Sequence, residues 1–139
     1  MNWCLVPVAI LLGGCDFTLS RPDQDNFTIH ASKQQAERFV EDLSRQFDAS
    51  VDPQDLNGLG NDSSRMFWLN GPKAELTITP VPDDRCDPNA SVRSTYNQGE
   101  YRIDLVYRSA SEAARKLARR TLIQSAQEAG LKITEFKEC

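Results

Sequence analysis

The sequence predicts an α+β fold, a two-layer sandwich in which two helices pack on one face of a mainly antiparallel sheet. Two segments repeat apolar residues at helical spacing, and each follows a serine that could cap a helix. Segments that alternate apolar and polar residues lie before, between and after these helices. A chain of 139 residues has room for one such domain.

The first strand and helix are predicted between Asn26 and Phe47. Asn26 to Ile29 has the composition of a short strand. Ser32 and Gln35 match a capping box, which pairs two otherwise unbonded backbone donors at a helix start. The residues expected on the buried face of the helix recur at i, i+3, i+4, i+7 and i+11, namely Ala36, Phe39, Val40, Leu43 and Phe47.

A hairpin is predicted in the middle of the chain, after a polar loop over residues 49–64. The arms are Arg65 to Leu69 and Ala74 to Val81, joined by the turn dipeptide Asn70-Gly71. Because proline cannot donate to a ladder, Pro72 and Pro80 favour an edge position for the second arm.

The last third is predicted as strand, helix and strand, after a polar loop over residues 82–99. Tyr101 to Tyr107 alternates, Ser109 and Glu112 match a second capping box, and Gly130 suits a helix end. The expected helical stripe consists mostly of small residues, namely Ala114, Leu117, Ala118, Thr121, Leu122, Ser125, Ala126 and Ala129. With a final strand over residues 131–136, the arrangement is close to a ferredoxin-like split βαβ fold with one extra strand.

The N-terminus indicates a targeting segment. The apolar run Leu5 to Leu12 is shorter than the roughly 20 residues that cross a bilayer, but it fits the apolar core of a secretory signal. Leu12-Gly13-Gly14-Cys15 resembles the lipobox of bacterial lipoprotein precursors. The resemblance implies cleavage before Cys15 and acylation of that cysteine, for example with palmitate. The expected organisation is a signal peptide (1–14), a lipid-attached tether (15–25) and one domain (26–139).

Asp16 extends the resemblance, because an aspartate there is similar to the inner-membrane retention signal of Gram-negative lipoproteins. We therefore expect a lipid-anchored protein on the periplasmic side of the cell membrane. The alternative is a buried N-terminal strand with an ordinary cysteine at position 15.

The remaining cysteines suggest a disulfide. Cys4 leaves with the signal and Cys15 takes the lipid, so Cys86 and Cys139 remain and are expected to pair in an oxidising compartment. Closing the 53-residue loop between them contributes up to about 4 kcal/mol in the chain-entropy view. Two free thiols in a cytosolic protein are the alternative.

Few residues suggest catalysis or cofactor binding. His30 is the sole histidine and the chain has no C-x-x-C, so no metal site and no cofactor are expected. No G-x-S-x-G motif, phosphate loop or EF-hand pattern occurs. A net charge of -4 argues against sequence-independent binding of nucleic acid. A pair of carboxylates brought together by folding is the one catalytic arrangement that the sequence leaves open.

Two features are candidate partner-binding sites. Basic residues cluster on the last helix and the strand before it, namely Arg115, Lys116, Arg119, Arg120, Arg102 and Arg108. They could contact an acidic protein or anionic lipid, or form an ordinary solvated helix face. Trp68 on the hairpin could anchor an interface, or it could belong to the core.

The expected function is therefore that of a non-enzymatic, membrane-anchored periplasmic lipoprotein whose domain binds another envelope protein. An inhibitor or immunity protein against an envelope-acting toxin or lytic enzyme is the specific hypothesis. An accessory structural lipoprotein of a secretion or other cell-envelope assembly is the alternative, and a small hydrolase is a third.

Overall fold

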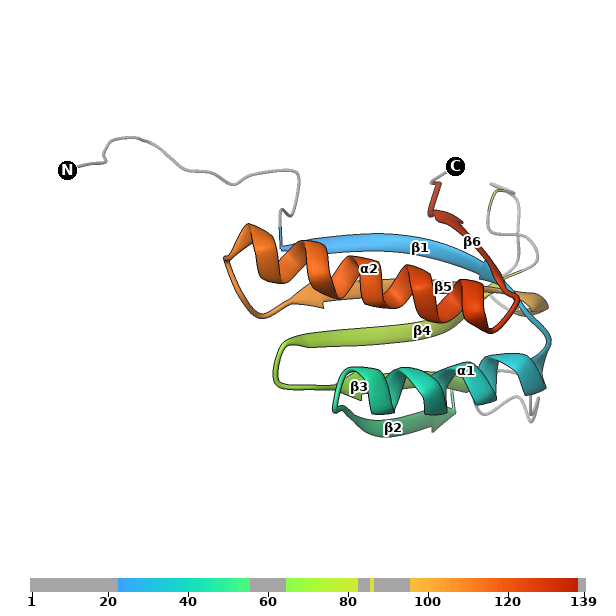
Figure 1. Cartoon of the computed structure of the whole chain (residues 1–139). Coiled ribbons are helices and arrows are strands. Elements are labelled where there is room, and N and C mark those ends of the chain that lie inside the picture. The colour runs from blue at the N-terminus through green and yellow to red at the C-terminus, as the bar shows by residue number, and fades with distance from the viewer. Residues whose placement is uncertain (1–22, 56–64, 83–85, 87–95, 138–139) are drawn as a thin grey trace.

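A computed structural model of the chain describes residues 23–55, 65–82, 86 and 96–137 (Figure 1). Two helices and six strands follow one another along the chain. They are β1 (Gln24–His30), α1 (Lys33–Gln46), β2 (Ser50–Asp55), β3 (Arg65–Asn70), β4 (Ala74–Pro82), β5 (Tyr96–Tyr107), α2 (Glu112–Glu128) and β6 (Lys132–Glu135).

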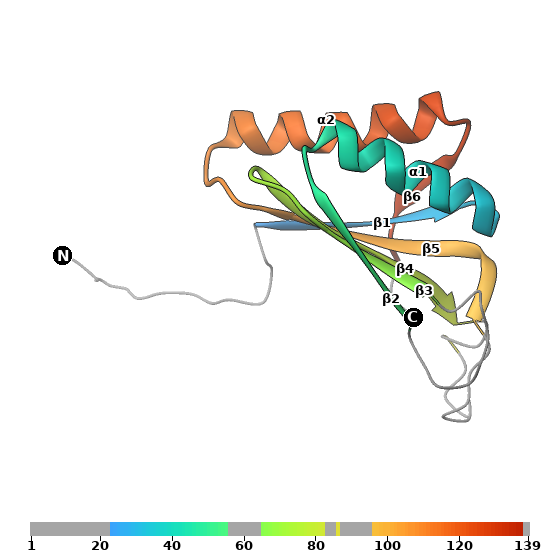
Figure 2. The ribbon, with the colours of Figure 1, turned by 90° about the horizontal axis from the view of Figure 1, so that it is seen from below.

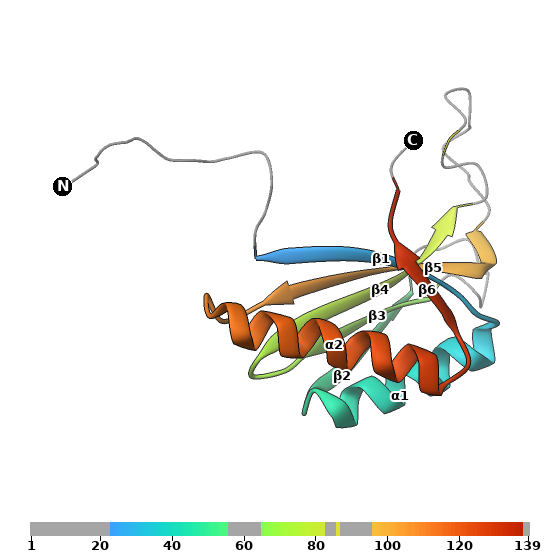
Figure 3. The ribbon, with the colours of Figure 1, turned by 45° about the horizontal axis from the view of Figure 1, so that its top comes forward.

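The strands form one antiparallel sheet in the order β2-β3-β4-β5-β1-β6. Both helices cover the same face of this sheet (Figure 2), and they lie side by side in front of it in Figure 3. The predicted α+β two-layer sandwich is confirmed. Strand β5 lies between β4 and β1, and β1 lies between β5 and β6, which is the interleaving of a split βαβ fold. Here β2 and β3 are both added to that core, where one extra strand was predicted.

The capping box of α1 forms as predicted. The amide of Gln35 donates to Ser32 Oγ at 3.1 Å, and the amide of Ser32 donates to Gln35 Oε1 at 2.8 Å. The predicted apolar face of α1 is buried in the core. The helix ends with Asp48 in the left-handed region at φ 51°, so that the amide of Ala49 reaches back to the carbonyl of Ser44 at 2.9 Å.

Helix α2 begins later than the predicted capping box. Its N-cap is Ser111, whose Oγ accepts from the amide of Ala114, whereas Ser109 Oγ accepts from the amide of Ser111. The prediction of Ser109 as the cap was wrong, because a serine nearer the helix takes that role. Gly130, at φ 75°, ends the helix as predicted.

Part of the predicted α2 stripe is exposed. Ala118, Leu122, Ser125 and Ala126 are buried, but 51% of the Leu117 surface remains accessible. Leu117 lies beside the C-terminal end of α1, beyond which α1 no longer covers α2. There it lines a groove. Its placement in the core was therefore wrong.

Three predictions about the strands need correction. Residues 50–55 form β2 within the predicted loop, although they include Pro53, because an edge strand tolerates proline. Strand β5 starts at Tyr96, inside the second predicted loop. Strand β4 lies between β3 and β5 and is not an edge; Pro80 fits there because the register shifts between it and Val81.

Packing and turns complete the domain. The core lies between the helices and one face of β1, β3, β4 and β5. The turn after β3 needs glycine at Gly71, since a Cβ there would lie 2.6 Å from the carbonyl oxygen of Phe47. Within the described residues, neither helix has the length and apolar character to cross a bilayer.

Candidate functional site

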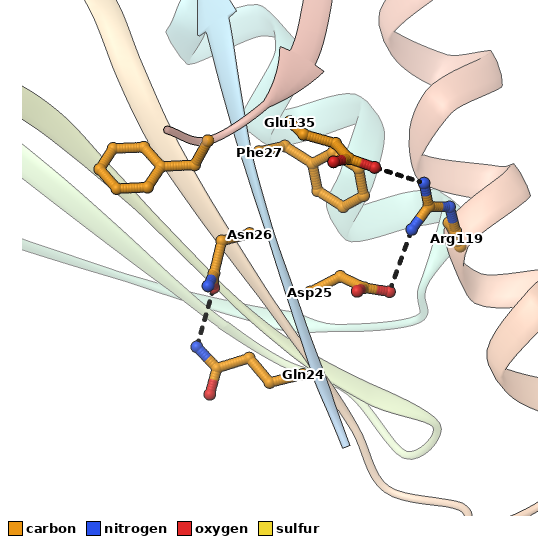
Figure 4. A pocket seen from close by; sticks show the side chains of 7 residues that line it. Gln24, Asp25, Asn26, Phe27, Arg119 and Glu135 are labelled. Carbon is orange, nitrogen blue, oxygen red and sulfur yellow. Dashed lines mark hydrogen bonds and ion pairs between the residues drawn. The ribbon is translucent and has the colours of Figure 1, made fainter. Parts of the chain in front are cut away.

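Arg119 extends from α2 to the edge of the sheet and lies between two acidic residues (Figure 4). Its Nη1 is 3.3 Å from Oδ2 of Asp25 on β1, and its Nη2 is 3.5 Å from Oε2 of Glu135 on β6. The guanidinium also lies 5.2 Å from the centre of the Phe27 ring, within cation–π range. Arg119 therefore links α2 to two adjacent strands, and its charge is already paired inside the domain.

The same carboxylate of Asp25 accepts a hydrogen bond from the Tyr107 hydroxyl on β5. Burial and, next to it, this hydrogen bond raise the pKa of Tyr107 well above its usual value of 10.0. The hydroxyl consequently remains a hydrogen-bond donor at neutral pH. Sequence reasoning missed this junction because Asp25 and Tyr107 are 82 positions apart and no local pattern links them.

A small open pocket of about 210 Å³ adjoins the contact between Arg119 and Asp25. It is lined by Gln24, Asp25, Asn26, Phe27, Arg119, Glu135 and Phe136. Its polar side chains contact one another, as Figure 4 shows: Arg119 is paired twice, and Gln24 Nε2 donates to Asn26 Oδ1 at 2.9 Å. These internal pairs favour a structural role for the pocket walls.

The predicted basic cluster is divided by the fold. Arg115, Lys116 and Arg120 stay on α2 with Arg119, and Lys116 Nζ lies 3.5 Å from Glu112 Oε2 in an exposed pair. Arg115 lines a second small pocket together with Tyr107 and Asp25. Arg120 is exposed, so it is the residue of this cluster that best fits the solvated-face interpretation.

The sequence analysis grouped Arg102 and Arg108 with the basic residues of α2, but in the structure they do not extend the α2 surface. Arg102 alternates with buried Tyr101 and Ile103, so it lies on the sheet face opposite the helices. There its Nε donates to Asp104 Oδ1 at 2.8 Å, and its guanidinium lies 4.3 Å from the centre of the Phe136 ring. Arg108 Nε donates to the carbonyl of Gly71 at 2.7 Å, which ties β5 to the β3–β4 turn.

The face of the sheet opposite the helices, called the open face below, carries Trp68. Phe67 and Leu69 point into the core, so Trp68 lies on the open face, with 41% of its surface exposed. The indole Nε1 donates a hydrogen bond to the carboxylate of Glu75 on β4. The structure thus answers the question left by the sequence: Trp68 is a surface residue held in a defined position.

The neighbours of Trp68 on the open face follow from the strand register. Asp52 on β2 and Thr77 on β4 lie directly opposite Trp68 on its two sides. Thr77 in turn pairs with Asp104 on β5, and Asp104 pairs with Asn26 on β1. One row of side chains therefore runs across the open face from the β2 edge to β1, with Trp68 as its large aromatic member.

A more apolar groove of about 480 Å³ lies at one end of the sandwich, between the helices and the β3–β4 turn. It is lined by Gln46, Phe47, Asp48, Pro72, Lys73, Ser109, Ala114, Leu117, Ala118 and Thr121. Its polar side chains are scattered around an apolar floor, and they form no arrangement that indicates a particular reaction.

The residues of the predicted lipidation site, Leu12 to Asp16, and Cys139 lie outside the described residues. Cys86 is exposed. Its pairing with Cys139 stays a prediction.

The described residues bring no three histidine, cysteine, aspartate or glutamate side chains together as a metal site would require. His30 is exposed at the end of β1. Comparison of the chain with models of known protein families and with curated proteins gave no match.

Proposed function

We propose that the protein is a non-enzymatic lipoprotein of the cell envelope, anchored to the membrane through Cys15, whose domain binds another protein at the open face of its sheet. The observation that carries the proposal is the exposed Trp68, held by Glu75 on a sheet face that neither helix covers. The membrane anchor rests on the N-terminal sequence Leu12-Gly13-Gly14-Cys15.

A fixed, exposed tryptophan suits protein binding for two physical reasons. Burial of its large apolar surface by a partner is favourable, and tryptophan is enriched among the residues that dominate interface energies. Its hydrogen bond to Glu75 also restricts the side chain before binding, so less conformational entropy is lost when the complex forms.

An inhibitor or immunity protein against an envelope-acting toxin or lytic enzyme is the specific function that we propose. Such a protein needs a binding face, a rigid scaffold and a location near its target, and it needs no catalytic residues. At the α2 edge Arg119 is paired with Asp25 and Glu135, whereas on the open face Trp68 is exposed and oriented by Glu75.

The anchor is tested by the mass of the mature N-terminus in membrane fractions, for the wild type and for Cys15→Ser. We expect a wild-type N-terminus that starts at acylated Cys15, with the protein in the inner membrane, and an unacylated Cys15→Ser protein. Intact mass with and without reduction tests the Cys86–Cys139 pairing in the same sample. An unacylated wild-type protein in the cytosol would refute the anchor.

The binding face is tested by site-specific photo-cross-linking in cells. A photoreactive amino acid replaces Thr77, the neighbour of Trp68 on the open face, or Gln124, an exposed residue of α2 that serves as the matched control. We expect one discrete cross-linked protein from position 77 and none from position 124, and loss of the cross-link when Trp68→Ala is added. Equal cross-linking from both positions would show that the open face has no special role.

A further inference from the structure

The open face near Trp68 is acidic as well as aromatic. On β2, β3 and β4 the open face carries only two ionisable side chains within the described residues, and both are acidic: Asp52 and Glu75. Asp52 lies directly across from Trp68 on β2, and Glu75 reaches the indole from β4. We call Trp68, Asp52 and Glu75 the Trp68 patch.

Among the described residues, no cation pairs with the carboxylates of the Trp68 patch. Glu75 accepts one hydrogen bond, from the Trp68 indole, and Asp52 accepts one from Gln54 Nε2 at 3.1 Å. The structure gives neither of them an ion pair with a described residue. Arg108 reaches the adjacent turn, but it is bound there to Gly71 and Asn70. The patch thus retains negative charge on both sides of an exposed aromatic ring.

From this arrangement we infer that the Trp68 patch binds an arginine side chain presented by the partner protein. The inference rests on the proposed function and specifies the chemistry of the partner. An apolar partner surface would remove water from two carboxylates without replacing their hydrogen bonds, which is unfavourable. A guanidinium stacked on the indole gains a cation–π interaction, and its N–H groups can reach the flanking carboxylates.

Arginine fits the patch better than lysine. Its planar guanidinium stacks on an aromatic face, is more weakly hydrated than an ammonium group, and offers donors in several directions. Neighbouring strands lie about 4.8 Å apart, so a group centred over Trp68 is close to side chains from both β2 and β4. The Trp68 patch therefore offers a π face on β3 and a carboxylate acceptor from the strand on each side of it.

The test uses the fluorescence of Trp68 in the purified protein in detergent. Trp3→Phe removes the other tryptophan of the sequence, so that uncleaved precursor contributes no signal. The probe is an acetylated, amidated tri-arginine peptide, and the matched control probe replaces arginine with citrulline, which has nearly the same shape without the charge. We expect a saturable change with arginine that weakens at high salt, and no such change with citrulline.

Variants separate charge from orientation. Glu75→Gln retains an acceptor for the indole N–H but removes the charge. Asp52→Asn retains an acceptor for Gln54 Nε2 and removes the charge on β2. Each is expected to weaken binding of the arginine peptide about fivefold, the effect of removing one charge near a solvated site. Glu135→Gln removes an equal charge at the edge by α2, and it should change binding less than about twofold.

Two results would overturn the inference: an equal response to citrulline, or wild-type affinity in both Glu75→Gln and Asp52→Asn. Cross-linking from position 77 without an arginine response would overturn this inference and support the proposed function. An arginine response without cross-linking from position 77 would support the Trp68 patch and contradict the proposed protein-binding role.

Discussion

Replacing Arg119 with glutamine should destabilise the domain, although the sequence placed this residue in a candidate binding surface. The change removes two ion pairs, to Asp25 and Glu135, and a cation–π contact with Phe27. Ion pairs at this level of exposure contribute about 0.5 kcal/mol each, and an exposed cation–π contact about 0.5 kcal/mol. The free energy of unfolding should therefore fall by about 1.5 kcal/mol.

Arg120→Gln is the matched control, because it makes the same chemical change one position further along α2, at an exposed residue. Urea denaturation should give a lower midpoint for Arg119→Gln and an unchanged midpoint for Arg120→Gln. In thermal unfolding, the Arg119 change should lower the midpoint by about 5 °C in a domain of this size. If both variants had the same stability, Arg119 would not link α2 to the sheet, and the assignment of its charge to the interior contacts would be wrong.

Three further predictions concern stability. Tyr107→Phe should lower the free energy of unfolding by about 1 kcal/mol at pH 7 through loss of the hydrogen bond to Asp25. Because the raised pKa of Tyr107 favours the neutral phenol in the folded state, the wild type should lose this extra stability as the pH rises above 10.0. The urea midpoints of the wild type and Tyr107→Phe should therefore converge between pH 7 and pH 11. Asp48→Gly should stabilise by about 0.5–1 kcal/mol by relieving the left-handed backbone, whereas Asp48→Ala should not, which calorimetry can compare. Gly71→Ala should destabilise by about 2 kcal/mol or more, measured by urea unfolding, because its Cβ would meet the Phe47 carbonyl oxygen.

The parts of the fold predicted correctly are those determined by local physics. Ser32 and Gln35 form the predicted capping box through contacts between residues three positions apart, and the apolar spacing of α1 leaves one choice for its buried face. β2 was missed because its sequence, SVDPQD, is polar and contains proline. Its strand conformation comes from pairing with β3, and pairing between distant segments leaves little trace in a short polar sequence.

The candidate site was predicted less well, because side-chain roles depend on which elements become neighbours. Arg119 and Asp25 are 94 positions apart, and they meet because β1 lies in the sheet beneath α2. Leu117 has the spacing of a core residue, yet α1 ends before it can cover that part of α2. Trp68 could be assigned to the surface only once Phe67 and Leu69 were known to face the helices, because alternate residues of a strand point to opposite faces of the sheet.

The register of the sheet and the proposed anchor together limit where a partner can be. From Cys15 to Asp23, where the described chain begins, an extended tether spans at most about 28 Å. Trp68 lies in the same cross-strand row as Asn26, three residues along β1 from Asp23, or about 10 Å of strand. The row crosses three strand spacings, about 14 Å, between Asn26 and Trp68. A lipid on Cys15 would thus hold the Trp68 patch within about 45 Å of the bilayer surface. A target that inserts into the membrane or works at its surface satisfies that distance, whereas a target confined to a more distant layer of the envelope does not.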